Sequence, residues 1–316
     1  MIRTFIYASF LCAATAAQAA KPTYAINDLL LGFRKVGATQ CYLVNIGQAS
    51  QFTGATAPFT VNTGGSIAAD LITVLGNNWA TDSTVTWSVS GTTGTFNAVG
   101  TDPAKTLYAT REEAVPGTQS TPWTIASSTN RATTTTRMSS MANTFVNYDV
   151  SASSTAAVIQ GSDDANSYRN FQPGGTSSNT GGSPGISFGA FNPSIEGSFA
   201  NGAAGSVLDL YRIPNTGTAA GFVGKFTITA AGVVTFTPPT AAIVPLEVAF
   251  FNYVPGLAQI GFKGNPGTNY TVQRSTSLTT GTWTNLATVQ AAPGGTFAYS
   301  DSAAPAGRAF YRAIKP

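Results

Sequence analysis

Histidine is absent from the 316-residue chain, and its absence excludes a large part of enzyme chemistry. Without an imidazole there is no Ser-His or Cys-His nucleophile, no His-ligated zinc and no histidine acid–base step. Catalysis would have to rest on carboxylate, lysine or tyrosine side chains. The composition therefore favours a protein that is not an enzyme.

Charge is scarce as well. Charged residues make up 9% of the chain, whereas an average soluble domain has about 25%. The net charge is only +3 and no run of lysine and arginine occurs, so we expect no binding of nucleic acid. Hydrophobic residues reach 43%, which is ample for a core. Thr, Ser, Ala and Gly take the place of the missing charged residues, as in the strands and turns of proteins outside the cell.

Long hydrophobic runs are missing beyond the start of the chain. Residues 1–20 have the parts of a secretory signal peptide: Arg3, an apolar segment over residues 5–14, and a small-x-small cleavage site at Ala17-Gln18-Ala19. A buried first helix is the alternative. No later stretch reaches about 18 apolar residues, so we expect no membrane span after removal of the leader. The sequence predicts a secreted protein, extracellular or at the cell surface.

The chain has only 2 cysteines. Cys12 lies in the predicted leader, and its removal leaves Cys41 alone, which excludes an intrachain disulfide. Cys41 begins an apolar segment that we interpret as a strand. We expect it to be a buried small side chain rather than a reactive thiol.

The clearest strand pattern covers residues 83–91. Val85, Trp87 and Val89 alternate with Thr and Ser, which indicates a half-buried strand. Other short apolar runs, separated by Gly and Pro, predict further strands. Helical spacing predicts two short helices, one at residues 67–75 and one around Met138, Met141 and Phe145. The pattern is that of an all-β fold with one or two short helices.

Composition also predicts the domain organisation. Residues 172–185 are rich in Gly, Ser and Pro and predict a flexible loop within a β-sandwich-like main domain over residues 21–237. Consecutive prolines predict a linker at residues 238–242. Residues 243–316 form a small second domain, in which Leu246, Val248 and Phe250 alternate and Trp283 and Leu286 are expected to fill the middle. Its strand spacing resembles a small immunoglobulin-like or fibronectin type III-like sandwich.

The second domain contains four short motifs: Tyr270-Thr271-Val272-Gln273-Arg274-Ser275-Thr276, Trp283-Thr284-Asn285-Leu286, Tyr299-Ser300-Asp301 and Phe310-Tyr311-Arg312. Together they resemble a C-terminal module common in secreted proteins of Verrucomicrobia and Planctomycetes. The motifs are structural, so the resemblance implies export and a module of this type, and it assigns no functional residues.

The main domain carries motifs of the same kind: Asp28-Leu29-Leu30-Leu31-Gly32-Phe33-Arg34, Tyr42-Leu43-Val44-Asn45-Ile46-Gly47, Asp102-Pro103, Thr106-Leu107-Tyr108-Ala109 and Leu208-Asp209-Leu210-Tyr211-Arg212. They resemble exported proteins of that lineage, of the exosortase-sorted type. Such proteins end in a Pro-Glu-Pro motif, a membrane segment and basic residues. The sequence ends instead in Arg312-Ala313-Ile314-Lys315-Pro316, so we do not expect sorting by that route.

Two sets of residues are candidates for binding. The aromatic residues Trp79, Trp123, Tyr108 and Tyr168 lie in polar, turn-rich segments and could stack on the apolar faces of sugar rings, although core or edge packing is the preferred interpretation. Asp163, Asp164 and Asn166 cluster hard oxygen ligands, which suit Ca²⁺, but the full calcium-loop pattern is lacking and a plain polar turn is the preferred interpretation.

The adjacent pair Glu112-Glu113 offers no acid/base machinery, because neighbouring residues on a strand point to opposite faces. We expect solvated charges there and no catalytic residue. The leading hypothesis is a secreted, non-enzymatic surface or extracellular-matrix protein with a structural or adhesive role. Its partners would be copies of itself or an extracellular polysaccharide, and it would need no cofactor. The alternative is a carbohydrate-binding protein assisted by Ca²⁺, and a carboxylate-based glycoside hydrolase is a more remote one.

Overall fold

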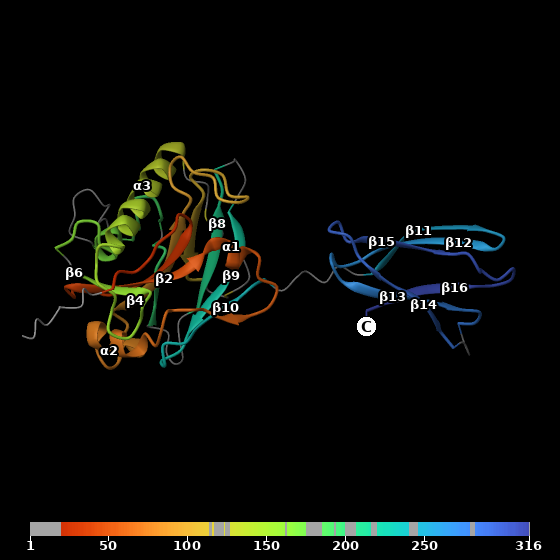
Figure 1. The fold of residues 1–316 in the computed structure, drawn as a ribbon, viewed down its shortest axis with the longest axis horizontal. Coiled ribbons are helices and arrows are strands. Elements are labelled where there is room, and N and C mark those ends of the chain that lie inside the picture. Colours follow the sequence, from red (N-terminus) through yellow and green to blue (C-terminus); the bar gives the residue numbers. More distant parts are fainter. Residues whose placement is uncertain are drawn as a thin grey trace, which may run out of the picture. The chain divides into compact units, whose positions relative to one another are not determined.

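The computed structural model describes residues 20–113, 116, 123, 127–161, 163–174, 185–192, 194–199, 207–215, 220–239, 246–278 and 282–315. The chain divides into two compact units, one ending at Pro239 and the other beginning at Thr240 (Figure 1). The predicted signal peptide lies outside the described residues except for Ala20, as does most of the predicted loop at 172–185.

The N-terminal unit is built on one antiparallel ten-stranded sheet. Its strands follow the order β3-β10-β9-β8-β5-β4-β1-β2-β6, and β7 pairs with β4. The strands are β1 (Asp28–Lys35), β2 (Gln40–Gln48), β3 (Phe59–Thr60), β4 (Val85–Thr92), β5 (Leu107–Arg111), β6 (Ala157–Gly161), β7 (Gly197–Ser198), β8 (Val207–Ile213), β9 (Gly221–Ile228) and β10 (Val234–Thr237). The helices are α1 (Ala49–Thr53), α2 (Ala68–Leu75) and α3 (Ser128–Phe145), with 3-10 helices η1 (Trp79–Thr81) and η2 (Tyr168–Phe171).

The sheet is buried on both faces. Along β1, Leu29, Leu31 and Phe33 belong to one core cluster, with residues of α1, α2 and η1. Leu30 belongs to the cluster on the opposite face, which contains residues of α3 (Figure 1). A strand covered on both sides is apolar throughout, which explains the run of three leucines. The predicted all-β, sandwich-like class with a few helices is confirmed.

Two details differ from the sequence-based expectations. The polar side of β4 is buried rather than exposed, because Ser88 lies under η2 and shares a hydrogen bond of 2.7 Å with the Tyr168 hydroxyl. The second predicted helix is long: α3 begins at Ser128, and the Ser127 hydroxyl caps it by accepting from the Asn130 backbone N–H at 3.2 Å. Its first half is rich in threonine, so the apolar spacing marked only its second half. Of the helices that the structure describes, none is long and apolar enough to cross a membrane.

The C-terminal unit is a sandwich of two three-stranded antiparallel sheets (Figure 1). One has the order β11-β12-β15, with β11 (Glu247–Val254), β12 (Leu257–Lys263) and β15 (Thr296–Asp301). The other has the order β14-β13-β16, with β14 (Thr284–Gln290), β13 (Asn269–Ser275) and β16 (Phe310–Ile314).

The core of this unit is filled by stacked aromatic rings rather than by Trp283. Phe297 stacks on Phe262 with ring centroids 5.2 Å apart and on Tyr270 with centroids 4.8 Å apart. Trp283 is only half-buried, and the Arg312 guanidinium lies 4.0 Å from its ring centroid. The expectation that Trp283 fills the middle is therefore wrong, because Arg312 and Trp283 pair away from the core cluster.

A bulge in β11 decides which residues face the core. The pairing of β11 with β12 shifts between Val248 and Phe250, so Phe250 pairs with Gly261 and Phe251 with Ile260. Paired residues share a face of the sheet. Ile260 is buried, so Phe251 lies on the inner face and Phe250 on the outer one. The alternation in the sequence predicted Val248 and Phe250 on one face of the sheet. The bulge between them puts them on opposite faces, and alternation alone does not reveal a bulge.

Candidate functional site

Strand β11 is exposed along its whole length, although most of its residues are apolar. The exposed fractions are 61% for Val248, 46% for Phe250, 51% for Phe251, 43% for Tyr253 and 56% for Val254. Soluble domains rarely expose so many large apolar side chains in one continuous stretch, and such a stretch commonly marks an interaction site. Among the described strands, β11 has a hydrogen-bonded neighbour on one side only, which leaves its other edge open.

The inner-face residues of β11 are exposed because the sandwich is open on this side. β11 ends one sheet and β16 ends the other, so no further described strand covers the space between them. Phe251 of β11 and Tyr311 of β16 meet across this space with ring centroids 5.9 Å apart. We call this side, lined by β11 and β16, the open side of the sandwich.

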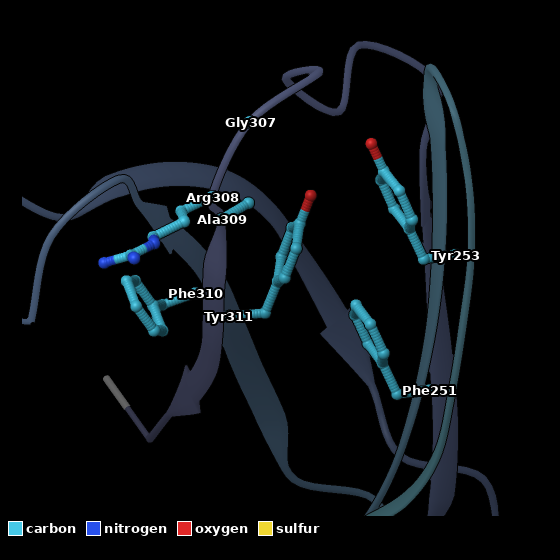
Figure 2. Close-up of a pocket in the computed structure, with 7 residues that line it drawn as sticks. All are labelled: Phe251, Tyr253, Gly307, Arg308, Ala309, Phe310 and Tyr311. Atoms are coloured by element: carbon cyan, nitrogen blue, oxygen red, sulfur yellow. The ribbon is translucent and has the colours of Figure 1, made fainter.

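A pocket of about 410 Å³ lies on the open side. Figure 2 shows the Tyr253 and Tyr311 rings facing each other across it, with Phe251 beside them. The chain segment of Gly307, Arg308, Ala309 and Phe310 forms the remaining wall. Figure 2 also shows the Arg308 and Phe310 side chains on the side of the β16 segment away from the two tyrosines. The interior is therefore mainly aromatic.

The two tyrosine hydroxyls of the pocket already donate within the protein. The Tyr253 hydroxyl donates to the Pro305 carbonyl at 3.3 Å. The Tyr311 hydroxyl donates to Asp301 Oδ2 at 2.8 Å, and Arg274 Nη1 donates to the same oxygen at 2.7 Å. What the pocket offers a ligand is aromatic surface, with few groups left to direct hydrogen bonds.

The ionisation of this cluster follows from its contacts. Burial and the bond to the carboxylate raise the pKa of Tyr311 to about 12, so the hydroxyl keeps its proton at neutral pH. Burial alone would raise the pKa of Asp301, but hydrogen bonds from Tyr311, Arg274 and the Ala303 backbone outweigh it and lower this pKa. The charged Asp301 thereby holds the Tyr311 ring in place.

The four aromatic residues predicted to stack on sugars are buried in the N-terminal unit. Trp79 and Tyr108 pack on one face of the sheet, and Trp123 and Tyr168 pack on the other. Their exposed fractions are 2% for Trp79, 4% for Trp123, 1% for Tyr108 and 0% for Tyr168. A buried ring has no face to offer a ligand, so the stacking hypothesis is wrong for all four, and they pack in the core as the preferred interpretation had it.

The hydroxyl groups of Tyr108 and Tyr168 each lie in a cluster of charged side chains. The Tyr108 hydroxyl donates to Asp102 at 2.7 Å, and Arg212 Nε donates to the other oxygen of that carboxylate at 2.5 Å. The Tyr168 hydroxyl donates to Glu196 at 3.1 Å, and Glu196 also pairs with Arg34 through two hydrogen bonds. These clusters join distant segments of the chain, which is a structural role.

The candidate calcium ligands form a turn rather than a cage. Asp164 Oδ1 accepts from the Asn166 backbone N–H at 2.8 Å, and Asp164 Oδ2 accepts from the Tyr148 hydroxyl at 3.0 Å. Asp163 and Asp164 are accompanied by no third acidic, histidine or cysteine ligand, and the described residues contain no such group of three. The local geometry matches the preferred interpretation, a polar turn.

The carboxylates do not form a hydrolytic pair at the pockets described. A second pocket, of about 420 Å³, lies on the N-terminal unit and has Asp28 as its one acidic residue. Asp28 already accepts from Asn45 Nδ2 at 2.8 Å and from Gln48 Nε2 at 2.5 Å, whereas glycoside hydrolysis needs two carboxylates. Glu113, expected to be solvated, is instead buried and accepts from the Tyr211 hydroxyl at 2.8 Å.

The open side was not predicted as a site. Its one signal in the sequence is β11 itself, where residues of both faces are apolar although the strand lies at the edge of a small domain. The residues of β16 give no such signal. Comparison adds nothing to the geometry: no family model matches the chain, and no curated protein or solved structure is similar to it.

Proposed function

We propose that this chain is a secreted, non-enzymatic surface or extracellular-matrix protein that adheres through the open side of its C-terminal unit. The observation that carries the proposal is β11, an edge strand that exposes apolar residues on both faces. Burying those residues against a partner is favourable, at roughly 25 cal/mol per Å² of apolar surface.

An extended polypeptide strand fits this surface better than a sugar does. A strand added to β11 would satisfy backbone groups at the open edge and place alternate side chains against the rings of Phe251 and Tyr253. A sugar needs directed hydrogen bonds as well as stacking, and the hydroxyls of Tyr253 and Tyr311 already donate within the protein. The open side therefore favours adhesion by strand addition.

The test compares two phenylalanine-to-lysine variants in cells that make the protein. Phe250→Lys places a charge on the outer face of β11, where the side chain is 46% exposed and lies over Gly261, and a thermal melt of the variant checks that the unit still folds. Phe96→Lys is the matched control, because Phe96 is 92% exposed on the N-terminal unit. We expect Phe250→Lys to move the protein from the surface or matrix fraction into the medium and Phe96→Lys to leave it in place. Equal retention of both variants would overturn the proposal.

Polysaccharide binding is the second candidate, favoured by the two tyrosine rings that face each other across the pocket (Figure 2). Facing rings can hold a pyranose by stacking. This candidate predicts that the purified protein is retained on an insoluble polysaccharide and that Tyr253→Ala abolishes the retention. Calcium dependence of that retention, removed by EDTA, would support the assisted form of this hypothesis.

A further inference from the structure

We infer that the strand that adds to the open edge of β11 is β11 of a second copy of this chain. The two strands would pair antiparallel about a two-fold axis that passes between the two Asn252 residues. This inference rests on the proposed function and names its partner. Two copies joined in this way would turn the sheet β11-β12-β15 into one continuous sheet of twice the width. The argument depends on the order of residues along β11, on the surface it exposes and on its lack of charge.

The order of residues makes β11 complementary to itself. With Asn252 opposite Asn252 of the second copy, Phe251 lies opposite Tyr253, and Phe250 lies opposite Val254. The pairing with β12 puts Phe251 and Tyr253 on the inner face, opposite the buried Ile260 and Ala258. It puts Phe250, Asn252 and Val254 on the outer face, and directly opposed residues in an antiparallel pair point to the same face. Every pair in this register therefore joins residues of one face.

Other registers fail for identifiable reasons. A shift by one residue would oppose inner-face to outer-face residues, because side chains alternate along a strand. A shift by two residues in one direction brings the bulge at Ala249 opposite Tyr253. The same shift in the other direction brings Pro255, which has no backbone N–H, opposite Phe251. The strand thus defines one register over residues 250–254.

The surface available suits a weak, reversible dimer. Phe250, Phe251 and Tyr253 are each about half exposed. An aromatic side chain buries roughly 150–250 Å² in full, so these three, Val254 and the backbone together would bury roughly 400–500 Å² per copy. Over both copies this is roughly 800–1,000 Å², which lies below the roughly 1,200 Å² of total buried surface at which stable interfaces begin. Anchored copies at a cell surface or in a matrix meet at high local concentration, where many weak contacts add up.

Charge does not oppose the pairing. Residues 250–254 include no acidic or basic side chain, and Glu247, at the start of β11, lies opposite Lys263 of its own copy. The pairing would also place the partner's rings beside Phe251 and Tyr253, and so cover the apolar surface of the open side.

The test is disulfide trapping in the chain with one cysteine added, in which the native Cys41 is fully buried. In the Asn252→Cys variant the two thiols would face each other across the two-fold axis, and both kinds of antiparallel pair keep Cα atoms within the range that a disulfide spans. In the Gln259→Cys control the thiol lies on the same outer face one strand further in, opposite Asn252. Its copies would be roughly 14 Å apart, three strand spacings, which is too far to bridge.

We expect mild oxidation to convert most of Asn252→Cys to a covalent dimer and to leave Gln259→Cys a monomer. In sedimentation the unmodified chain should dimerise reversibly, and Phe251→Ser should weaken this roughly tenfold. Equal trapping of the two cysteine variants, or an unmodified chain that stays monomeric at high concentration, would overturn the inference. If the unmodified chain is monomeric but the Phe250→Lys variant is still released from the cell surface, the adhesive function stands and another partner occupies β11. If the Phe250→Lys variant stays at the surface but the Asn252→Cys variant forms the covalent dimer, the pairing stands and only the adhesive function fails.

Discussion

Gly32, in the middle of β1, lies against the ring of Tyr168. A Cβ atom added at Gly32 would be 2.5 Å from the nearest ring carbon, and the ring is held by hydrogen bonds to Ser88 and Glu196. We expect Gly32→Ala to lower the free energy of unfolding by about 1–3 kcal/mol, the usual cost of overpacking. Gly221→Ala is the control, because nothing lies within 4 Å of its added Cβ. Thermal melts of both variants test this, and equal stability would mean that the ring moves at little cost.

Cys41 shows how burial governs reactivity at the same scale. The side chain is fully buried, and desolvation raises the pKa of its thiol to about 12. Thiol reagents attack the thiolate, so we expect Cys41 to remain unlabelled by iodoacetamide in the native chain at pH 8 and to react fully in denaturant. Mass spectrometry of the peptide that carries Cys41 measures both states. Rapid labelling of the native chain would show that this part of β2 opens locally.

At the scale of elements, the strands were predictable and the site was not. Alternating apolar residues located β4, and the apolar runs located β1 and β2, because burial of a strand leaves a mark in local sequence. The bulge in β11 left no such mark, since a register shift arises from pairing with β12. For Trp79 and Tyr168 the local sequence left both stacking and core packing open, because the segments that cover them are distant in sequence.

The network between β13, β15 and β16 makes the C-terminal unit sensitive to acid. Contacts with Tyr311 and Arg274 lower the pKa of Asp301 in the folded state. A lowered pKa contributes stability above the unfolded value, about 3.9, and this contribution is lost as the pH falls through the folded value. We therefore expect the melting temperature of this unit to decrease when the pH is lowered below about 4. Asp301→Asn should melt lower at pH 7 and lose this part of the pH dependence, whereas an unchanged acid profile would contradict the assignment.

At the scale of the whole molecule, the described core clusters keep to their own units. Two of them lie on the two faces of the ten-stranded sheet, and the third fills the C-terminal sandwich. The first two clusters pack on opposite faces of one sheet and should unfold together, whereas the third belongs to the other unit, so we expect calorimetry of the full chain to show two transitions. Gly32→Ala should lower only the transition of the N-terminal unit, and Asp301→Asn only that of the C-terminal unit. A small domain buries a smaller share of its surface than a large one, so the C-terminal transition should come first. A single transition that both substitutions lower equally would mean that the two units fold as one.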